Sequence, residues 1–401
     1  MLDELGRVTD EPGKLTRTFL SPAMRRANGL VGGWMREAGL AVREDAVGNL
    51  IGRAEGARAG AKTLLLGSHL DTVRDAGRFD GPLGVLLPVV ALGELSRRGV
   101  MLPFAVEVLG FSEEEGVRFA SAYLGSEGYA GRLKAKTLGL RDGAGVSVGE
   151  VLKEFGGGKF SLPKPVHRRG ELLGYVEVHI EQGPVLEAKR LAVGVVSAIA
   201  GQSRFKLTWT GKAGHAGTTP MALRRDALAG AAEFALAAEQ LARGTAGLVA
   251  TVGALTVSPG AANVIPGLVV HTLDVRHARD AARREALLHL GRLAARLAKQ
   301  RGLTVSWQRT QDNGAVECSP ELTARLERSV KAVQGRSLSL VSGAGHDGVV
   351  MSALAPVAML FVRCREGLSH HPDEYASPAD LEIALRVMVD FLERMAQQHA
   401  S

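Results

Sequence analysis

Cysteine and aromatic residues are scarce in this chain, and it has no apolar run long enough to cross a bilayer. Only Cys318 and Cys364 occur among 401 residues, which excludes a disulfide framework and thiolate-rich metal sites and favours a reducing compartment. The longest apolar stretch, residues 82–95, contains two glycines and Glu94 and is too short for a membrane span. The amino-terminal residues include acids where a secretory signal carries bases. We therefore expect a cytoplasmic protein with no membrane partner.

A concentrated basic surface is also lacking, although the formal net charge is +7. The bases are scattered in short pairs such as Arg97-Arg98 and Arg224-Arg225, and aromatic residues make up only 4% of the chain. A nucleic-acid interface needs bases gathered in a patch or stripe. We expect no nucleic-acid partner, and only a modest contribution of the charge to steering anionic substrates.

The chain is longer than a single ordinary core, and its pattern of elements predicts two domains. Strands at 63–66 and 104–109 with a buried helix at 85–98 between them give the strand–helix–strand order of an α/β fold. From about Gly201 the pattern changes to a compact α+β unit, with strands at 203–209, 248–257, 268–276 and near Trp307, and helices at 225–243 and 279–302. We place a discontinuous catalytic domain at 1–201 and 316–401, and an inserted domain at 202–315.

Other elements of the larger domain have clear sequence signals. Ser21-Pro22 predicts the start of a helix over 23–40, with a serine N-cap and a proline in the first turn, and Gly39 predicts its end. Residues 173–180 alternate as a strand, 321–333 show helical periodicity, and 357–362 form a last apolar strand.

A histidine and two carboxylates follow the strand at 63–66. His69 and Asp71 come directly after it, and Asp80 lies nine residues beyond Asp71. Because ligands bind at the carboxyl ends of strands in open α/β sheets, we expect these side chains to converge. Imidazole with carboxylate suits Zn²⁺, Mn²⁺ or Co²⁺. The alternative is that Asp71 caps a helix and His69 is a core histidine.

Three further groups also follow strands. The acidic triple 113–115 comes after the second strand, where packed carboxylates repel each other unless cations hold them or one keeps its proton. A charged helix N-terminus is the simpler alternative there. His179 lies on the strand at 173–180, where a core histidine is the alternative. His370 follows the strand at 357–362, with His371 as a rival.

These motifs occur in a recognisable order from residues 15–17 through 67–72, 114–119, 179–184, 213–221, 263–267, 274–276 and 345–347 to 367–372. The order resembles the dinuclear metallo-aminoacylase and carboxypeptidase superfamily, and most closely its branch of allantoate amidohydrolases, N-carbamoyl-L-amino-acid hydrolases and β-ureidopropionases. The resemblance covers nearly the whole chain; one departure is Gly348, where the family has alanine. It implies a metallopeptidase-like catalytic domain, with a mixed sheet flanked by helices, and a smaller α+β lid domain through which the chain forms a homodimer.

The resemblance also implies a site with two divalent ions, Zn²⁺, Mn²⁺ or Co²⁺. The implied ligands are Asp80 as the bridge between the ions, His69 and His179 on one ion, and Glu115 and His370 on the other. Glu114 would be the general base, and Asp71 would orient the ring of His69. The implied reaction is hydrolysis of a terminal ureido C–N bond, with release of ammonia and carbon dioxide.

Substrate contacts are implied as well, by Gln182, Ser369, Asn263, Arg276 and His215. His215 would reach the partner subunit's site and donate a hydrogen bond to the oxyanion, and the arginine fork suits a substrate carboxylate. Each residue of the inserted domain has an alternative. Arg276 could pair with Asp274, Asn263 could be an ordinary turn asparagine, and His215 could cap a strand.

The residues favour one substrate over two others. Residues 194–202 resemble the allantoate enzymes slightly more, so a small anionic ureido compound, allantoate, is the first choice, N-carbamoyl-L-amino acids are second and β-ureidopropionate is third. A non-catalytic anion- or nucleic-acid-binding protein with a decayed site would have lost ligands, but all five candidates and Glu114 are present. A general peptidase of the same superfamily would lack a histidine at 179, where this chain has His179.

Overall fold

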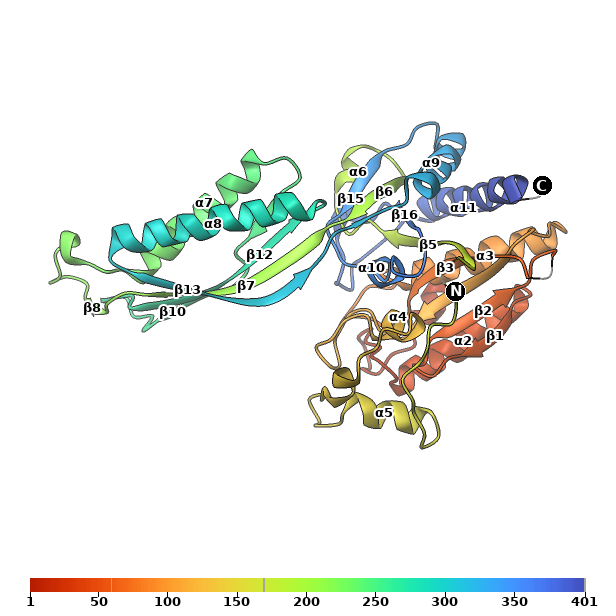
Figure 1. Cartoon of the computed structure of the whole chain (residues 1–401), viewed down its shortest axis with the longest axis horizontal. Helices are drawn as coiled ribbons and strands as arrows, with labels where there is room; N and C mark the ends of the chain where they lie inside the picture. Colours follow the sequence, from red (N-terminus) through yellow and green to blue (C-terminus); the bar gives the residue numbers. More distant parts are fainter. Residues whose placement is uncertain (59, 169, 400–401) are drawn as a thin grey trace. The chain divides into compact units, whose positions relative to one another are not determined.

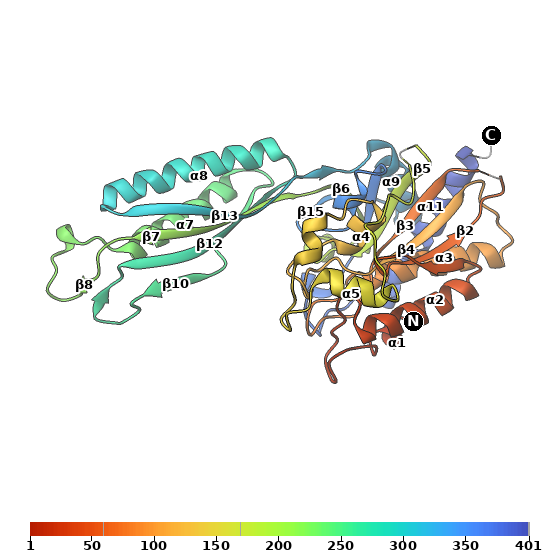
Figure 2. The ribbon, with the colours of Figure 1, turned by 60° about the horizontal axis from the view of Figure 1, so that its bottom comes forward.

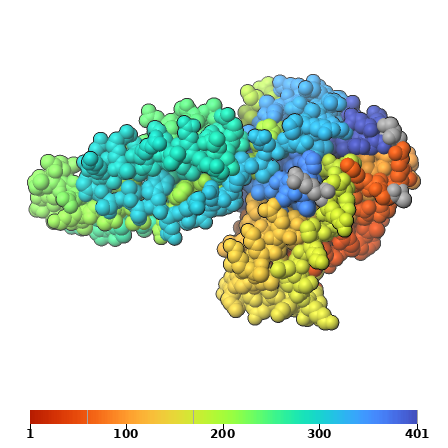
Figure 3. All heavy atoms as spheres, viewed as in Figure 1, coloured from red at the N-terminus to blue at the C-terminus, as the bar shows by residue number. Residues whose placement is uncertain are grey.

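The computed structural model describes residues 1–58, 60–168 and 170–399, and the chain forms two compact units (Figure 1). Unit 1 comprises Met1–Ser197 with Glu317–Ser401, and unit 2 comprises Ala198–Val316. Figure 3 shows unit 2, coloured green to cyan, as a continuously packed body. A role of the inserted segment as a lid or dimerisation domain stays a prediction.

A nine-stranded mixed sheet runs through unit 1 in the order β1-β2-β4-β3-β5-β16-β6-β14, with β15 paired to β6. The strands are β1 (Ala41–Glu44), β2 (Leu50–Ala54), β3 (Thr63–His69), β4 (Ala105–Phe111), β5 (Leu172–Ile180), β6 (Val193–Ile199), β14 (Val316–Glu317), β15 (Ser339–Ser342) and β16 (Val357–Val362). Strands β4, β3, β5 and β16 are parallel neighbours and almost wholly buried. Their carboxyl ends therefore meet at one edge of the sheet.

Helices flank this sheet and bury its apolar faces. The longer ones are α2 (Pro22–Glu37), α3 (Pro82–Arg97), α9 (Pro320–Gln334) and α11 (Pro378–His399), and the shorter ones are α1 (Leu2–Leu5), α4 (Leu124–Tyr129), α5 (Val148–Phe155), α6 (Val185–Ala188) and α10 (Gly348–Met351). Short 3₁₀ turns lie at η1 (Ala135–Gly139) and η3 (Arg365–Gly367). The apolar sides of α2, α3, α9 and α11 join the strands in one large core. The predicted α/β class and the mixed sheet flanked by helices are confirmed.

The start of α2 shows why the sequence predicted it well. The Ser21 hydroxyl accepts the backbone N–H of Met24 at 3.1 Å, and Pro22 occupies the first helical position, where its missing N–H costs nothing. The helix ends at Glu37, three residues earlier than predicted, and Gly39 adopts φ +88° just beyond it. A glycine tolerates this left-handed conformation without strain.

Unit 2 is a five-stranded antiparallel sheet with two helices on one face (Figure 2). Its elements are β7 (Gly201–Thr210), β9 (Val249–Thr251), β10 (Leu255–Ser258), β12 (Leu268–His277), β13 (Thr304–Asn313), α7 (Ala227–Gly244) and α8 (Asp280–Arg301). Trp209, Phe234 and Leu290 lie at the centre of its core. The single strand predicted over 248–257 is wrong, because β9 ends at Thr251 and β10 begins only at Leu255.

A small two-stranded sheet completes unit 2. It pairs β8 (Gly214–His215) with β11 (Val264–Ile265), and η2 (Met221–Leu223) follows β8. No helix in the described part of the chain is long and apolar enough to cross a membrane. Cys318 and Cys364 are both buried and free. The cytoplasmic location stays a prediction.

Candidate metal centre

The parallel strands of unit 1 bring the five predicted ligands to the same edge of the sheet. His69 is the last residue of β3, and His179 lies one residue before the end of β5. Glu115 follows β4, His370 follows β16 and η3, and Asp80 lies two residues before α3. Segments that are up to 301 residues apart in the sequence, from His69 to His370, therefore meet in space.

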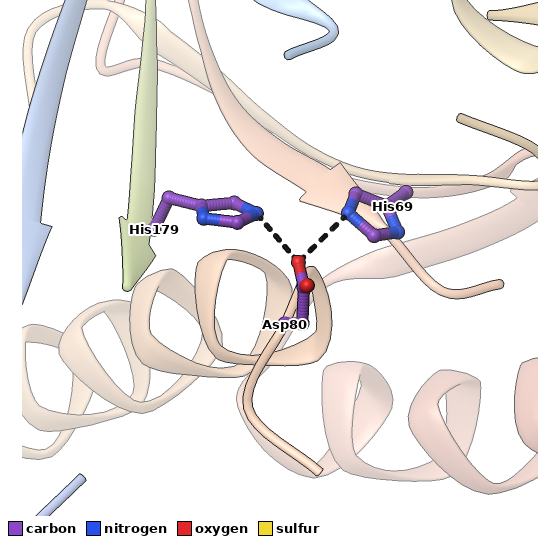
Figure 4. A group of neighbouring side chains, drawn as sticks. All are labelled: His69, Asp80 and His179. Carbon is purple, nitrogen blue, oxygen red and sulfur yellow. Dashed lines mark ion pairs between the residues drawn. The ribbon is translucent and has the colours of Figure 1, made fainter. Parts of the chain in front are cut away.

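Asp80 lies at the centre of these side chains, and the rings of His69 and His179 point toward it (Figure 4). Asp80 Oδ1 lies 3.1 Å from His179 Nε2 and 3.6 Å from His69 Nε2, and Asp80 Oδ2 lies 3.2 Å from His370 Nε2. Glu115 Oε1 lies 3.7 Å from His370 Nε2. Ligand atoms about 2.1 Å from a tetrahedral Zn²⁺ lie about 3.4 Å apart, so these separations fit metal coordination.

Two groups of three residues could each hold a metal ion, and Asp80 belongs to both. One group is His69, Asp80 and His179, and the other is Asp80, Glu115 and His370; in each, the ligand atoms lie within 4.8 Å of one another. A third such group joins Glu114 to His69 and Glu115. The nitrogen and oxygen donors suit a borderline divalent ion such as Zn²⁺, Mn²⁺ or Co²⁺.

The hydrogen bonds of both buried histidines direct Nε2 toward the centre. His69 Nδ1 lies 3.0 Å from the carbonyl oxygen of Asp71, and His179 Nδ1 lies 3.0 Å from the carbonyl oxygen of Ile180. Because a carbonyl only accepts, each Nδ1 carries a proton, and Nε2 is the ring nitrogen that faces the Asp80 carboxylate. A proton or a metal ion is then needed between these groups. The residues present fit a divalent metal.

The Asp71 carboxylate links the first predicted ligand to the acidic segment after β4. Its Oδ1 lies 3.3 Å from His69 Nδ1 and accepts the backbone N–H of Glu114 at 3.0 Å, and its Oδ2 accepts the backbone N–H of Glu115 at 3.2 Å. Asp71 is 1% exposed. It therefore contacts the ring of His69 and also fixes the backbone that carries Glu114 and Glu115, which the sequence did not indicate; its role in orienting a metal ligand stays a prediction.

Burial and mutual repulsion raise the pKa values of the three consecutive glutamates. Burial is the largest cause for each, and the charges of Asp71, Glu115 and Asp80 are the next largest for Glu113, Glu114 and Glu115 respectively. The pKa of Glu115 rises to about 7, and those of the other two rise well above their usual range. Without a cation, these raised pKa values favour the protonated forms of the three carboxyl groups, and protonation is one of the two conditions under which packed carboxylates can coexist.

Asp80 behaves in the opposite way. Burial alone would raise its pKa, but the contacts with His179, His370 and His69 outweigh this effect and hold the pKa well below its usual range. Asp80 is therefore an ionised carboxylate enclosed by nitrogen donors. A carboxylate of this kind, with an oxygen toward each group of ligands, can contact two cations at once.

Gln182 and Ser369, the predicted substrate contacts of unit 1, both bond to Asp80. Gln182 Nε2 donates to Asp80 Oδ2 at 2.9 Å and to Ser369 Oγ at 3.1 Å, and Ser369 Oγ lies 2.8 Å from Asp80 Oδ2. The amide oxygen of Gln182 is buried and has no hydrogen-bond partner among the described residues. It is an available acceptor beside the candidate ligands.

His215, the last residue of β8, and Asn263, the residue before β11, are two predicted contacts of unit 2 that lie close together. The backbone N–H of Ala216 donates to the Asn263 carbonyl at 2.9 Å. His215 Nδ1 accepts the backbone N–H groups of Gly217 and Thr218 at 3.1 and 3.2 Å, so the neutral ring carries its proton on Nε2. His215 is exposed and presents this N–H as a donor.

Arg276, the third predicted contact of unit 2, forms the ion pair that was its alternative. Its Nε and Nη2 donate to the two oxygens of Asp274, each at 2.9 Å. Arg204 and Gln202 also donate to Asp274 Oδ2, at 2.8 and 2.7 Å. These contacts hold Arg276 in a fixed orientation, and its role toward a substrate stays a prediction.

Sequence reasoning missed Glu374, which lies four residues after His370. Its carboxylate accepts the backbone N–H groups of Phe79 and Asp80 and contacts the hydroxyl of Ser369. An acidic residue so close to a predicted ligand was the available signal.

Asp347 is fully buried, and neither of its carboxylate oxygens has a hydrogen-bond partner among the described residues.

Comparison with known proteins decides the family. Residues 65–394 match peptidase family M20/M25/M40. The chain belongs to this family. The M20 family is metal-dependent, in agreement with the cluster of histidines and carboxylates around Asp80. The predicted superfamily is therefore confirmed.

Relatives of this M20-family chain include proteins named as amidohydrolases and deiminases. It is 42% identical to an N-carbamoyl-L-amino acid amidohydrolase of Geobacillus stearothermophilus, over 99% of this chain and 97% of the relative. It is 41% identical to allantoate deiminase 2 of Glycine max, over 98% of this chain and 88% of the relative. The crystal structure of an amidase of the hydantoinase/carbamoylase family from Burkholderia multivorans matches with a TM-score of 0.93 at 34% identity, covering 98% of this chain and 96% of that one. The predicted branch and the class of hydrolase are confirmed.

Proposed function

We propose that this chain is a metal-dependent amidohydrolase that cleaves the terminal ureido group of a small anionic substrate. In the overall reaction, R–NH–CO–NH₂ and one water give R–NH₂, ammonia and carbon dioxide. Allantoate is the first candidate substrate. The observation that carries the proposal is the enclosure of ionised Asp80 by His69, His179 and His370, with Glu114 and Glu115 beside them.

We propose that the centre holds two divalent ions, Zn²⁺, Mn²⁺ or Co²⁺, which share Asp80. His69 and His179 would complete the protein ligands of one ion, and Glu115 and His370 those of the other. When bound at such a site, divalent ions polarise a carbonyl and make a water more acidic. The two groups of three residues that share Asp80 support this arrangement.

Glu114 is the proposed general base and acid. Its buried carboxylate is held next to the ligand Glu115 by the bond from its backbone N–H to Asp71. There it can accept a proton from the attacking water and return it to the departing nitrogen. Burial raises the pKa of Glu114, and an ionised carboxylate with a raised pKa is the stronger base toward the proton of the attacking water.

The proposed substrate contacts are Gln182 and Ser369 of unit 1, and Asn263, Arg276 and His215 of the inserted segment. The Gln182 amide oxygen, which has no hydrogen-bond partner among the described residues, can accept a hydrogen bond from the ureido –NH₂, and Ser369 contacts the same amide group. Asn263 and Arg276 would bind the ureido and carboxylate groups. We also propose a homodimer through the inserted unit, in which His215 of the partner subunit donates its Nε2–H to the developing oxyanion.

An N-carbamoyl-L-amino acid is the second candidate, and the 42% identity to the Geobacillus enzyme favours it. The test is ammonia release by the full chain, stripped with a chelator and reloaded with Mn²⁺, Zn²⁺ or Co²⁺. We expect a higher kcat/KM with allantoate than with N-carbamoyl-L-amino acids, and no turnover by the stripped protein. A higher kcat/KM with the carbamoyl amino acids selects the second candidate. No ammonia from either substrate with any of the three ions contradicts the proposal.

A further inference from the structure

Glu374 lies under the loop that carries Asp80, although 294 residues separate the two in the sequence. Its Oε1 accepts the backbone N–H of Phe79 at 2.9 Å and that of Asp80 at 3.0 Å. A carboxylate that accepts two consecutive N–H groups fixes the orientation of that stretch of backbone. Glu374 is only 2% exposed, so these bonds are shielded from water.

The other carboxylate oxygen of Glu374 acts on the Asp80 side chain through Ser369. Ser369 Oγ lies 2.9 Å from Glu374 Oε2 and 2.8 Å from Asp80 Oδ2, and it accepts a hydrogen bond from Gln182. A hydroxyl has one proton, so Ser369 can donate to only one of the two carboxylates at a time. Glu374 thus competes with Asp80 for that proton and leaves Asp80 Oδ2 with more negative charge.

The backbone at Gly77 leaves just enough space for this side chain. A Cβ at Gly77 would lie 2.3 Å from Glu374 Cβ and 2.4 Å from Glu374 Oε1, closer than any unstrained contact. The Glu374 side chain therefore packs directly against the segment that leads to Asp80. A larger residue at position 77 would displace it.

We infer that Glu374 is a positioning residue of the metal centre, which holds the backbone of Asp80 and keeps the Asp80 carboxylate free to bind cations. The inference rests on the proposed function in one respect, namely that Asp80 binds metal. Glu374 itself touches neither metal nor substrate in this role. Its effect should therefore appear in metal affinity even when no substrate is present.

Glu374→Gln tests this role with little change of shape. The amide oxygen can still accept the two backbone N–H groups, but the –NH₂ can only donate toward Ser369, which must then give its proton to Asp80. We expect Zn²⁺ affinity, measured by competition with a chromogenic chelator, to fall about 10- to 100-fold. The far-UV circular dichroism and the Tm of the chelator-stripped protein should remain close to those of the wild type.

Glu187→Gln is the matched control. Glu187 Oε2 also accepts a backbone N–H from a distant residue, Glu366, at 2.9 Å, but Glu366 is not a predicted metal ligand. The Glu187→Gln variant should bind Zn²⁺ like the wild type. If Glu374→Gln does not fold, Glu374→Asp replaces it, since it keeps the charge but is too short to reach both partners; it should also bind Zn²⁺ more weakly.

The visible spectrum of the Co²⁺-loaded protein adds a readout that a purely structural role would leave unchanged. We expect Glu374→Gln to shift its absorption bands relative to the wild type. A folded Glu374 variant with wild-type Zn²⁺ affinity and an unchanged Co²⁺ spectrum would overturn the inference about Glu374 but leave the proposed metal centre standing. A wild-type chain that binds neither ion would instead refute the proposed metal centre and the inference with it.

Discussion

Asp71 Oδ1 accepts the backbone N–H of Glu114 at 3.0 Å, although the two residues lie on different loops, 43 positions apart. The same carboxylate faces His69 and bonds to the next backbone N–H, that of Glu115. One buried side chain thus sets the position of a proposed ligand on β3 and of the proposed base and second ligand after β4. The arrangement predicts that Asp71 affects metal binding and catalysis together.

Asp71→Asn tests this coupling. An asparagine has only one acceptor oxygen, so its –NH₂ must face one of the backbone N–H groups that the carboxylate now binds. We expect metal affinity to fall about 10- to 100-fold and turnover to fall with it. Asp45→Asn is the control, because Asp45 Oδ1 also accepts two backbone N–H groups, of Val47 and Asn49 at 2.9 and 3.0 Å, far from the candidate ligands in the sequence. Equal metal affinity of the two variants would contradict the prediction.

Glu114→Gln should separate catalysis from metal binding. Glu114 is not among the proposed ligands, and its amide counterpart cannot take up a proton from water. We expect the full metal content by elemental analysis and a loss of kcat of about 100- to 10,000-fold. Glu115→Gln is the matched neighbour, and it should lose metal as well as activity. A Glu114→Gln protein with nearly normal kcat would remove Glu114 from its proposed role.

Mixing two inactive variants tests whether His215 acts in the partner subunit's site. In a mixed dimer of His215→Ala and Glu114→Gln chains, one site has both wild-type groups and the other has neither. After subunit exchange in an equal mixture, about a quarter of all sites should be intact, so about a quarter of wild-type activity should return. If His215 acts within its own subunit, or if the chain is monomeric, the mixture stays inactive. Light scattering of the wild type checks the dimer independently.

Glu107 on β4 predicts a pH dependence of stability remote from the proposed ligands. Burial alone would raise the pKa of Glu107, but bonds from His167 and Tyr129 and the ion pair with Arg53 lower it to about 2. A carboxyl group whose pKa is lower in the folded than in the unfolded state stabilises the fold at pH values above its unfolded-state pKa, here about 4.5. As the pH falls from there toward 2, the free energy of unfolding loses this contribution, by about 1.4 kcal/mol per pH unit.

Glu107→Gln should therefore destabilise the protein by about 3 kcal/mol at pH 6, since it breaks a buried ion pair. The difference from the wild type should shrink between pH 4.5 and pH 2, because the wild type loses the same interaction there. Urea denaturation across this range measures both free energies of unfolding. The exposed Glu37→Gln variant is the control, and it should follow the wild type throughout. A constant difference between Glu107→Gln and the wild type would contradict the assignment.

Regular elements with strong local signals were predicted well. The strand at 357–362 is β16 residue for residue, and Ser21-Pro22 begins α2, because an apolar run or an N-cap is encoded within a few consecutive residues. The break between β9 and β10 was missed. The segment 248–257 is mostly apolar, and only its pairing with β12 along two separate stretches divides it.

By itself, the sequence determined the family, the α/β class and a set of candidate ligands, because strand ends, turn residues and motif order are local properties. Only the tertiary structure decided which side chains meet. It enclosed Asp80 among His69, His179 and His370, placed Glu374 beneath the Asp80 loop and paired Arg276 with Asp274. Such contacts depend on how the parallel strands align and on which loops follow them. The periodicity of the sequence carries no information about distances between neighbouring strands.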